Sequence, residues 1–303
     1  MNRILIKDIR QTDDANLIST VQIRRKTKKL YNSGATAIEF LLSDISGVMK
    51  GIKFTSGEED IDQIFEDVRL GDIYEISGTY STRFNSFKIS MLKKIDDFNL
   101  QDFIEIPDID VESLMKAIET VIEGLENIHL KNLSKFIFKD NEIMEKFKSA
   151  PSAIRMHHAY PRGNLEHIVG VMKVCKTLID YYKATKNPNI NEDLLLFGAI
   201  FHDIGKIFAY KEYNGIIIKT EQGEKLDHIT LGNIFMSKAI SSFRDFPEKL
   251  KLDILHLILS HHGREDWGSP VPPKIPEAQI LHLADLIDSR FKKSLEGKFQ
   301  MDL

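Results

Sequence analysis

The stretch Phe201-His202-Asp203-Ile204-Gly205-Lys206 places a histidine and an aspartate side by side at the end of an apolar run that begins at Leu194. An apolar run followed by a glycine predicts the last turn of a buried helix and its C-cap. Burial of ionisable groups there is costly unless a partner or a metal ion compensates for the lost hydration. A lone pair of this kind is usually hydrogen-bonded at a helix end, so its meaning depends on the other histidines.

Nine of the ten histidines fall between positions 150 and 303, where the patterning is helical almost throughout. His167 runs into one predicted helix and His228 opens another, while His261 and His262 close the predicted helix 250–260. Asp285 lies within the predicted helix 277–291. One such histidine is usually a satisfied core residue, but five or six at helix ends, with two aspartates, predict a metal site. Imidazoles with carboxylates suit Mn, Fe, Co, Ni or Zn better than Mg or Ca.

Length and composition indicate a globular protein of two domains. The chain has 303 residues, of which 42% are hydrophobic and 28% charged, and its formal net charge is −4. This charge excludes a global basic signature for nucleic acid, so any such site must be local. The single cysteine rules out an internal disulfide framework and suits a reducing compartment. The early charges argue against a signal peptide, and no apolar run approaches the roughly 18 residues of a membrane span. We therefore expect a cytoplasmic protein with no membrane partner.

Residues 1–98 carry short strand-like segments separated by turns rich in glycine, asparagine and serine. The predicted order is three strands, a helix around 61–68 and two further strands, which is the order of a five-stranded OB-fold barrel. The segments 41–47 and 70–78 resemble the nucleic-acid-binding OB modules. Residues 99–149 predict a helical connector and residues 150–303 an all-helical domain. The predicted fold class is therefore multidomain α+β.

The loops that join strands 1–2 and 4–5 of an OB-fold flank its oligonucleotide-binding face. Cations that follow phosphates and rings that stack on bases are what a single strand requires, and both predicted loops carry them. The basic run has an alternative explanation as a solvated edge strand, whose lysines discourage aggregation. The same chemistry in both loops favours nucleic acid. The predicted contact residues are Arg24, Arg25, Lys26, Lys28, Lys29, Tyr31, Tyr80, Arg83, Phe84 and Phe87.

The order His167, His202-Asp203, His228, His261-His262 and Asp285 resembles that of the HD-domain metal-dependent phosphohydrolases. More narrowly, the chain resembles the YhaM family of 3′→5′ exoribonucleases, which join an N-terminal OB-fold to an HD domain. The resemblance covers nearly the whole chain. It is most specific in the segments 151–160, 163–167, 202–206, 259–263, 268–270 and 278–288. This chain departs from the family at Arg162-Gly163-Asn164-Leu165, where two glycines usually precede "LLEH", and in its basic first strands.

The resemblance implies a site for two divalent ions, most often manganese. By the family's pattern, His167, His202, Asp203 and Asp285 would hold one ion. Asp203 would bridge to a second ion, which His228, His261 and His262 would hold.

Other residues are candidates for contacts to the substrate. Lys206, one turn past the ligand pair, either brings a positive charge to a phosphate oxygen or is a solvated helix-end lysine. His157 and His158 either bind the terminal phosphate, protonate the leaving oxygen, or are structural. Arg264 and Arg155 are further candidates for phosphate binding. His256, His282 and Asp288 either orient the ligands or are ordinary helix residues.

The sequence thus predicts a metal-dependent 3′→5′ exoribonuclease. It would hydrolyse single-stranded RNA, and single-stranded DNA as a further substrate, to nucleoside 5′-monophosphates, with Asp203 at the centre of the catalytic site. One alternative is an HD phosphohydrolase of a small nucleotide, and another is a non-catalytic single-strand-binding protein. The basic, aromatic loops argue against the first and the complete ligand set against the second. A homo-oligomer is left open.

Overall fold

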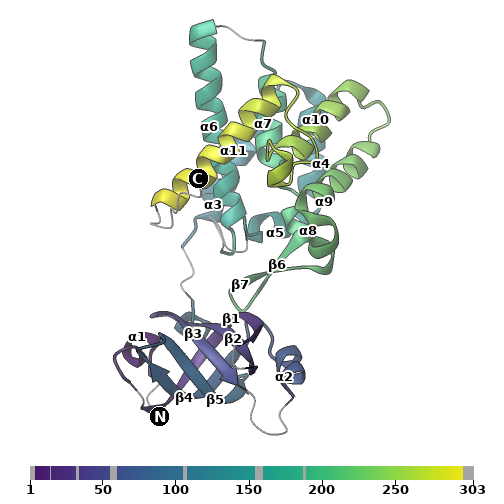
Figure 1. The fold of residues 1–303 in the computed structure, drawn as a ribbon. Coiled ribbons are helices and arrows are strands. Elements are labelled where there is room, and N and C mark those ends of the chain that lie inside the picture. Colours follow the sequence, from purple (N-terminus) through teal and green to yellow (C-terminus); the bar gives the residue numbers. More distant parts are fainter. Residues whose placement is uncertain are drawn as a thin grey trace. The chain divides into compact units, whose positions relative to one another are not determined.

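A computed structural model describes residues 4–13, 15–31, 34–54, 60–104, 108–153, 160–186 and 189–295. The chain separates into two compact units (Figure 1). One comprises Met1–Pro107 with Tyr213–Ile216, and the other comprises Asp108–Glu212 with Ile217–Leu303. The units are described separately below, as the barrel unit and the helical unit.

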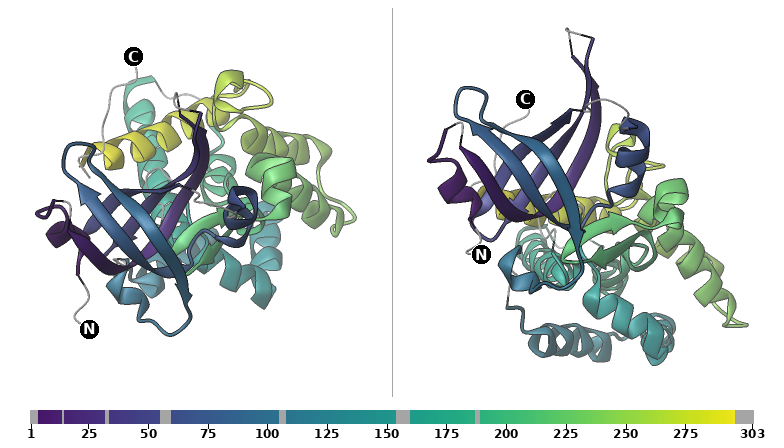
Figure 2. Two further views of the ribbon diagram at one scale, coloured as in Figure 1. Left: turned by 60° about the horizontal axis from the view of Figure 1, so that its bottom comes forward. Right: turned by 90° about the horizontal axis from the view of Figure 1, so that it is seen from below.

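The barrel unit is a closed five-stranded barrel with the strand order β1-β2-β3-β5-β4. All neighbouring strands are antiparallel except β3 and β5, which are parallel. This topology confirms the predicted OB-fold, and Figure 2 shows the strands curving around one axis. The elements are α1 (Ile6–Ile9), β1 (Asn16–Leu30), β2 (Thr36–Asp44), β3 (Gly47–Phe54), α2 (Ile61–Asp67), β4 (Ile73–Ser81), β5 (Ser86–Ile95) and η1 (Leu100–Asp102).

The basic run lies inside strand β1, which corrects its predicted place in the loop between the first two strands. Lys26 pairs with Phe40 and Lys28 with Ile38, after an irregularity between Ile23 and Arg25. The strand extends this far because β2 supplies a ladder partner for the run up to its last residue.

The barrel core is built from alternate side chains of the strands, because successive residues of a strand point to opposite faces. Ile23, Leu42, Ile76 and Phe87 are fully buried there. The segment after β5 stays with this unit, since Phe103 and Ile104 pack against Ile73. The boundary between the units therefore falls at 107/108, beyond the expected end of the barrel at residue 98.

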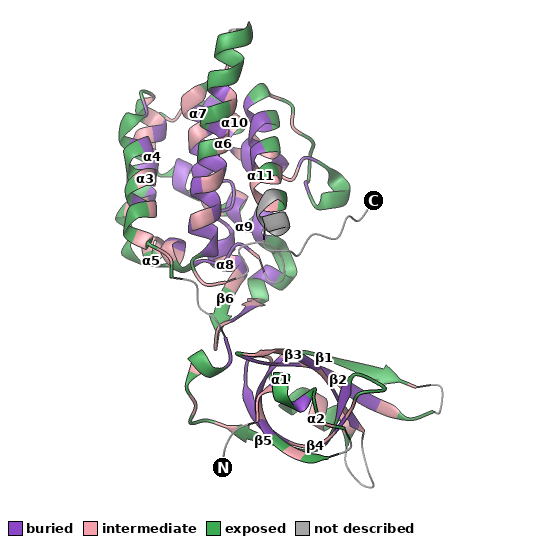
Figure 3. Cartoon of the chain, turned by 90° about the vertical axis from the view of Figure 1, so that its left-hand side faces the viewer, coloured by how far each residue is buried: buried purple, intermediate pink, exposed green. Residues whose placement is uncertain are grey.

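The helical unit is organised around α7 (Glu192–Phe201), whose apolar run is buried almost from end to end. Helices α4, α6, α10 and α11 contact it, so the ionisable residues that follow Phe201 lie deep in the unit. In Figure 3 the outer faces of these helices are green and the inner faces purple. The other elements are α3 (Val111–Gly124), α4 (Ile128–Lys139), α5 (Asn141–Ser149), α6 (Gly163–Lys186), α8 (Lys206–Ala209), β6 (Tyr210–Tyr213), β7 (Ile216–Lys219), α9 (Glu221–Ser241), α10 (Glu248–Ser260), η2 (Glu265–Trp267) and α11 (Pro276–Leu295).

Helices α3, α4 and α5, predicted as a connector and the first layer of a helical domain, contribute to the same apolar core as the helices after residue 150. A hairpin of β6 and β7 also interrupts the helical pattern, and sequence analysis did not predict it. Its turn is Asn214-Gly215, and both residues have positive φ, 48° and 74°. Asn-Gly is the strongest short-range hairpin signal, because both central residues of the preferred turn need positive φ.

Within the described part of the chain, none of the helices combines the length and the apolar character that crossing a bilayer requires.

Candidate metal centre and nucleic-acid face

The candidate metal centre forms where helices of the helical unit converge on Asp203. His167 lies on α6, His228 on α9 and Asp285 on α11. His202 and Asp203 follow α7, and the adjacent histidines 261 and 262 follow α10. The structure therefore brings together all seven residues that sequence analysis assigned to the metal ions.

Asp203 divides the centre into two halves. Its Oδ2 lies 3.5 Å from His167 Nε2 and 3.3 Å from His202 Nε2. Its Oδ1 lies 3.7 Å from His228 Nε2 and 3.5 Å from His261 Nε2. Each oxygen of this buried carboxylate thus faces a different pair of imidazoles, which is the geometry that a bridging ligand requires.

The remaining two predicted ligands extend the two halves. Asp285 Oδ1 lies 3.2 Å from His167 Nε2. His262 belongs to the other half, where it forms a cluster with His228 and His261. The potential ligand atoms of these three residues lie within 4.8 Å of one another. The same limit holds for the cluster His167, His202 and Asp203.

All five histidines are oriented in the same way, because each has a fixed acceptor at Nδ1. His202 and His261 reach the backbone carbonyls three residues before them, at 3.1 and 2.7 Å, and His262 reaches the Trp267 carbonyl at 2.9 Å. The acceptor is a carboxylate for the other two: Asp288 for His167, at 2.7 Å, and Asp227 for His228, at 2.8 Å. A neutral imidazole that donates from Nδ1 keeps its lone pair on Nε2. In all five histidines Nε2 is therefore the nitrogen left for a metal ion, which in His167 would first have to displace a proton.

Three buried atoms at the centre have no hydrogen-bond partner in the described structure: Asp203 Oδ1, His228 Nε2 and His261 Nε2. Buried polar atoms are almost always paired, so unpaired atoms that face one another need an explanation. Imidazole nitrogens and a carboxylate oxygen form the donor set of divalent transition metals. These residues fit a metal ion.

The electrostatics of the centre keep its carboxylates ionised. Burial alone would raise the pKa of Asp203, but Lys206 and His202 outweigh burial and hold that pKa well below its ordinary value. At Asp285 burial is likewise outweighed, chiefly by His167, and the pKa is lowered.

The imidazoles of the two halves differ in charge. Burial lowers the pKa of His228, and burial together with the neighbouring His261 and His228 lowers the pKa of His262 to about 3. At His167 burial acts in the same direction, but hydrogen bonds to Asp285 and Asp288 outweigh it and raise the pKa to about 9. His228 and His262 are therefore neutral, whereas His167 carries a proton that a bound metal ion would have to displace.

Gly205 brings α8 and α9 together. A Cβ on this glycine would lie 1.9 Å from the carbonyl oxygen of His228 and 2.4 Å from the amide nitrogen of Gly232. Its φ is −67°, so it is not the left-handed C-cap that the sequence suggested. Gly205 is needed because α9 packs directly against its Cα, and this close packing places His228 of α9 beside Asp203.

The candidate phosphate-binding residues have different surroundings. The ammonium of Lys206 is buried and bonds to Asp203 Oδ2 and Ser152 Oγ. Arg264 is exposed and makes two hydrogen bonds to Asp266, at 2.8 and 2.9 Å. Arg155, His157 and His158 lie outside the described residues.

Two further histidines have structural partners. His282 Nδ1 donates to the carbonyl of His261 at 2.9 Å, and this bond steadies the turn that carries a predicted ligand. His256 Nε2 instead accepts from the backbone N–H of Lys274, away from the centre, so it is an ordinary helix residue.

The aromatic part of the predicted nucleic-acid face needs correction. Phe87 is 0% exposed and Tyr80 only 3% exposed, with its hydroxyl donating to Asn85 Oδ1. These rings fill the barrel and cannot stack on a base, so both predictions are wrong. They fail because the alternation of β4 and β5 points these residues inward. Phe84, by contrast, is 69% exposed, and the Arg83 guanidinium lies 5.3 Å from its ring centre.

The cations of β1 are exposed in part and paired in part. Arg25 is exposed and has no ion pair with a described residue. Lys28 pairs with Asp62 of α2, and Lys29 lies 3.2 Å from Glu39. Both Lys26 and Lys28 lie over the ring of Phe65, at 4.3 and 4.7 Å.

Arg24 and Tyr31, the remaining predicted contacts, are half-buried. Arg24 Nε donates to Ser43 Oγ at 2.9 Å, and burial lowers its pKa. The Tyr31 hydroxyl donates to Glu39 at 2.7 Å. The basic strand is therefore a weaker cationic surface than its sequence suggests.

Replacing Lys28 and Lys29 with alanine should weaken RNA binding and reduce its salt dependence. Each cation that neutralises a phosphate contributes about 0.7 to the slope of log affinity against log salt for a single strand. Affinity for a labelled oligonucleotide, measured between low and physiological salt, checks this. The control variant, Lys173→Ala with Lys176→Ala, removes the same amount of charge from exposed positions of α6. A slope equal to that of the wild type would remove β1 from the binding face.

Replacing Glu39 with glutamine should have the opposite effect. Glu39 accepts from Lys50 and Tyr31 at 2.8 and 2.7 Å, and with Lys29 these contacts outweigh burial and lower its pKa to about 2. Removing this charge frees two lysines for phosphate, so RNA affinity should rise and the salt slope should steepen by up to about 1.4. The same titration measures both quantities. Unchanged binding would mean that this part of the barrel does not meet RNA.

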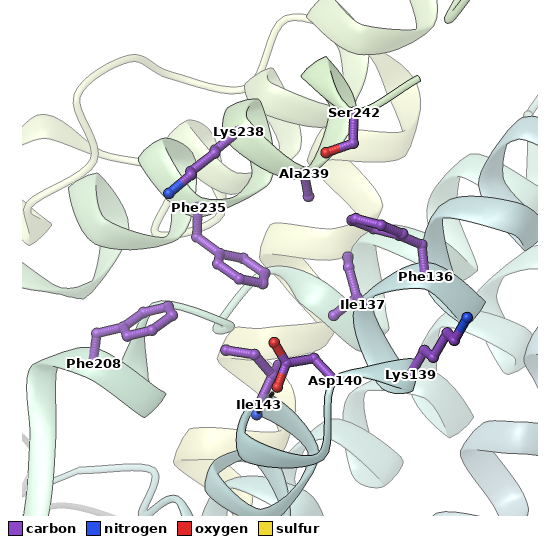
Figure 4. Close-up of a pocket in the computed structure, with 10 residues that line it drawn as sticks. All are labelled: Phe136, Ile137, Lys139, Asp140, Ile143, Phe208, Phe235, Lys238, Ala239 and Ser242. Carbon is purple, nitrogen blue, oxygen red and sulfur yellow. Dashed lines mark hydrogen bonds between the residues drawn. The ribbon is translucent and has the colours of Figure 1, made fainter. Parts of the chain in front are cut away.

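A separate groove lies elsewhere in the helical unit, between α4, α5, α8 and α9 (Figure 4). It has a volume of about 560 Å³ and includes the rings of Phe136, Phe208 and Phe235. The groove shares no lining residue with the metal centre.

The segment that leads into α6 contains Arg162-Gly163-Asn164-Leu165, where the sequence differs from the pattern of the family that it resembles. Arg162, where a glycine is usual, has φ 71°, in the left-handed region that favours glycine. Asn164 is completely buried, and neither its Oδ1 nor its Nδ2 has a hydrogen-bond partner in the described structure. The arginine is accommodated at the cost of local strain, directly before α6, whose first two turns carry Leu165 and His167.

Comparisons with known proteins agree with the predicted domain type and family. The family model described as "HD domain" matches residues 164–290. The chain is 29% identical over 293 residues to the "3′-5′ exoribonuclease YhaM" of Bacillus subtilis, a match that covers 95% of this chain and 88% of that protein. The protein of the same name from Oceanobacillus iheyensis is 29% identical over 294 residues (95% and 87% covered), and that from Listeria monocytogenes 28% over 294 residues (95% and 88%). The predicted resemblance to this family is confirmed.

Proposed function

Because the chain carries an HD domain and is a relative of the YhaM exoribonucleases over nearly its whole length, we propose that it is a metal-dependent 3′→5′ exoribonuclease. It would hydrolyse single-stranded RNA to nucleoside 5′-monophosphates, with single-stranded DNA as a further substrate. The direction of hydrolysis comes from the relatives alone.

One observation supports the proposal most strongly: the Nε2 atoms of four imidazoles lie 3.3–3.7 Å from the oxygens of one carboxylate, Asp203, while each Nδ1 has its own acceptor. Histidines that served only the core would have no reason to share this orientation. In the proposed centre, His167, His202, Asp203 and Asp285 hold one ion. His228, His261 and His262 hold the other, with Asp203 as the bridge, and manganese is the proposed metal.

Two divalent ions held by these residues would lower the pKa of a bound water and supply positive charge to the phosphoryl oxygens. The protein's part is to fix the ligands and to keep the site dry. Asp203, 1% exposed, is held ionised between the two sets of imidazoles.

Lys206 would provide the contact to phosphate. Its buried ammonium bonds to Asp203 Oδ2, inside the proposed centre. A fixed positive charge at this place would stabilise the negative charge that develops on a non-bridging phosphate oxygen. His157, His158, Arg155 and Arg264 remain candidates for contacts to the terminal phosphate or the leaving oxygen.

The barrel would hold the strand that the centre shortens. Arg25, the partly paired lysines of β1, and Phe84 with Arg83 supply exposed cations and a ring for this role.

RNA labelled at its 5′ end, incubated with the protein and Mn²⁺, tests the activity directly. A ladder that shortens from the 3′ end, with release of nucleoside 5′-monophosphates, is expected. A parallel incubation with single-stranded DNA measures the second substrate. Intact RNA together with hydrolysis of a free nucleotide would overturn the proposal in favour of a small-nucleotide phosphohydrolase.

A further inference from the structure

Asp227 has an unusual backbone conformation. It lies within the span of α9, yet its φ is 56° and its ψ 165°, so the helix is kinked there. This combination belongs to a region that is occupied almost only by glycine. Among the described residues, the other non-glycine positions with positive φ are Asn85, Arg162 and Asn214. A strained carboxylate directly before a candidate metal ligand is reason to ask what the strain supports.

The strained residue makes two short contacts with its neighbour. Asp227 Oδ1 accepts from the backbone N–H of His228 at 2.6 Å and from the ring Nδ1 of His228 at 2.8 Å. The carboxylate therefore holds both the backbone and the ring of one residue. The ring itself is buried, while Asp227 is at the surface.

The kink explains why a side chain is needed here. His202 and His261 use the carbonyl three residues earlier as the Nδ1 acceptor, which a continuous helical turn supplies. His228 directly follows the kink, so the preceding turn does not continue into it. In the described structure its Nδ1 hydrogen bond goes to Asp227.

We infer that Asp227 is a positioning residue for the second metal ion of the proposed function, on which this inference rests. Its carboxylate fixes the His228 tautomer and aims Nε2 at the space beside Asp203 Oδ1, 3.7 Å away. The backbone strain persists because glycine, which would relieve it, has no acceptor to offer.

Asp227→Gly separates the two roles, because it relieves the strain and removes the acceptor. Loss of a partner that orients a metal ligand typically costs 10–100-fold in metal affinity. We expect Asp227→Gly to bind the weaker of two Mn²⁺ ions about 10-fold to 100-fold less tightly, measured by calorimetric titration of metal-free protein. Its metal-free thermal unfolding temperature should equal or exceed that of the wild type. Asp227→Asn, which keeps an acceptor oxygen, should restore most of the affinity.

Asn85→Gly is the control. It places glycine at another non-glycine position of positive φ, 45°, in the barrel and outside the metal centre, and it should leave Mn²⁺ affinity unchanged. A wild-type protein that binds no Mn²⁺ would overturn the proposed metal centre itself. A wild-type protein that binds two ions, with Asp227→Gly binding them equally well, would overturn only the role of Asp227.

Discussion

Asp203→Ala should abolish RNA cleavage while leaving RNA binding intact. Asp203 is the only described side chain whose two oxygens face both sets of imidazoles, at 3.3–3.7 Å. Charge stabilisation by bound metal ions is worth several kcal/mol, and each 1.4 kcal/mol is about tenfold in rate. The rate of RNA shortening under single-turnover conditions should therefore fall by at least about 10³-fold.

Loss of Asp203 also leaves the buried Lys206 ammonium without its anion, which by itself destabilises a fold by about 3–5 kcal/mol. The double variant Asp203→Ala with Lys206→Met removes both charges and separates inactivity from unfolding. Asp245→Ala, an exposed carboxylate after α9, is the matched control and should cleave like the wild type. If Asp203→Ala kept its activity, or lost RNA binding instead, the site assignment would be wrong.

Removal of metal ions should stop cleavage reversibly and lower the stability of the helical unit. An ion that binds only the folded state at 100 times its dissociation constant adds about 2.7 kcal/mol of stability per site. Trp267 is the single tryptophan and its carbonyl accepts from His262, so its fluorescence reports unfolding of this unit alone. After chelation the Trp267 transition should shift to lower temperature, and Mn²⁺ should restore both it and activity. A Trp267 unfolding temperature that does not change on chelation or on addition of Mn²⁺ would contradict the proposed metal centre.

The metal-free protein should also show a pH dependence of a definite sign. The pKa of His167 is raised to about 9, from an ordinary value of 6.5. The stability contributed by this proton is therefore fully present below about pH 6.5 and lost as the pH rises through about 9, up to about 3 kcal/mol in total. Over the same range Mn²⁺ affinity should rise, because the ion displaces the proton.

Asp288→Asn provides the comparison, since one of the two carboxylates that raise the pKa of His167 is then neutral. The loss of metal-free stability should be smaller in this variant and should end at a lower pH than in the wild type. Identical pH profiles would mean that His167 is not protonated in the metal-free state.

The sequence by itself determined the two kinds of unit and the identities of the candidate ligands. Strand and turn residues in the first hundred positions predict the barrel, because turn chemistry and alternation are local properties. The motif His202-Asp203 with the other histidines predicts a metal centre, because few residue types can bind a transition metal and their clustering at helix ends is visible without the fold.

Burial and hydrogen-bond partners were decided only by the tertiary structure. Phe87 and Tyr80 are aromatic like Phe84, but pairing within the barrel directs the first two inward and leaves the third exposed. The acceptors that orient the imidazoles include Asp288, 121 positions from His167, and the carbonyl of Trp267. Such partners depend on how distant segments meet, and no local pattern carries that information. The sequence therefore named the candidate ligands, whereas the folded chain decided where each of them points.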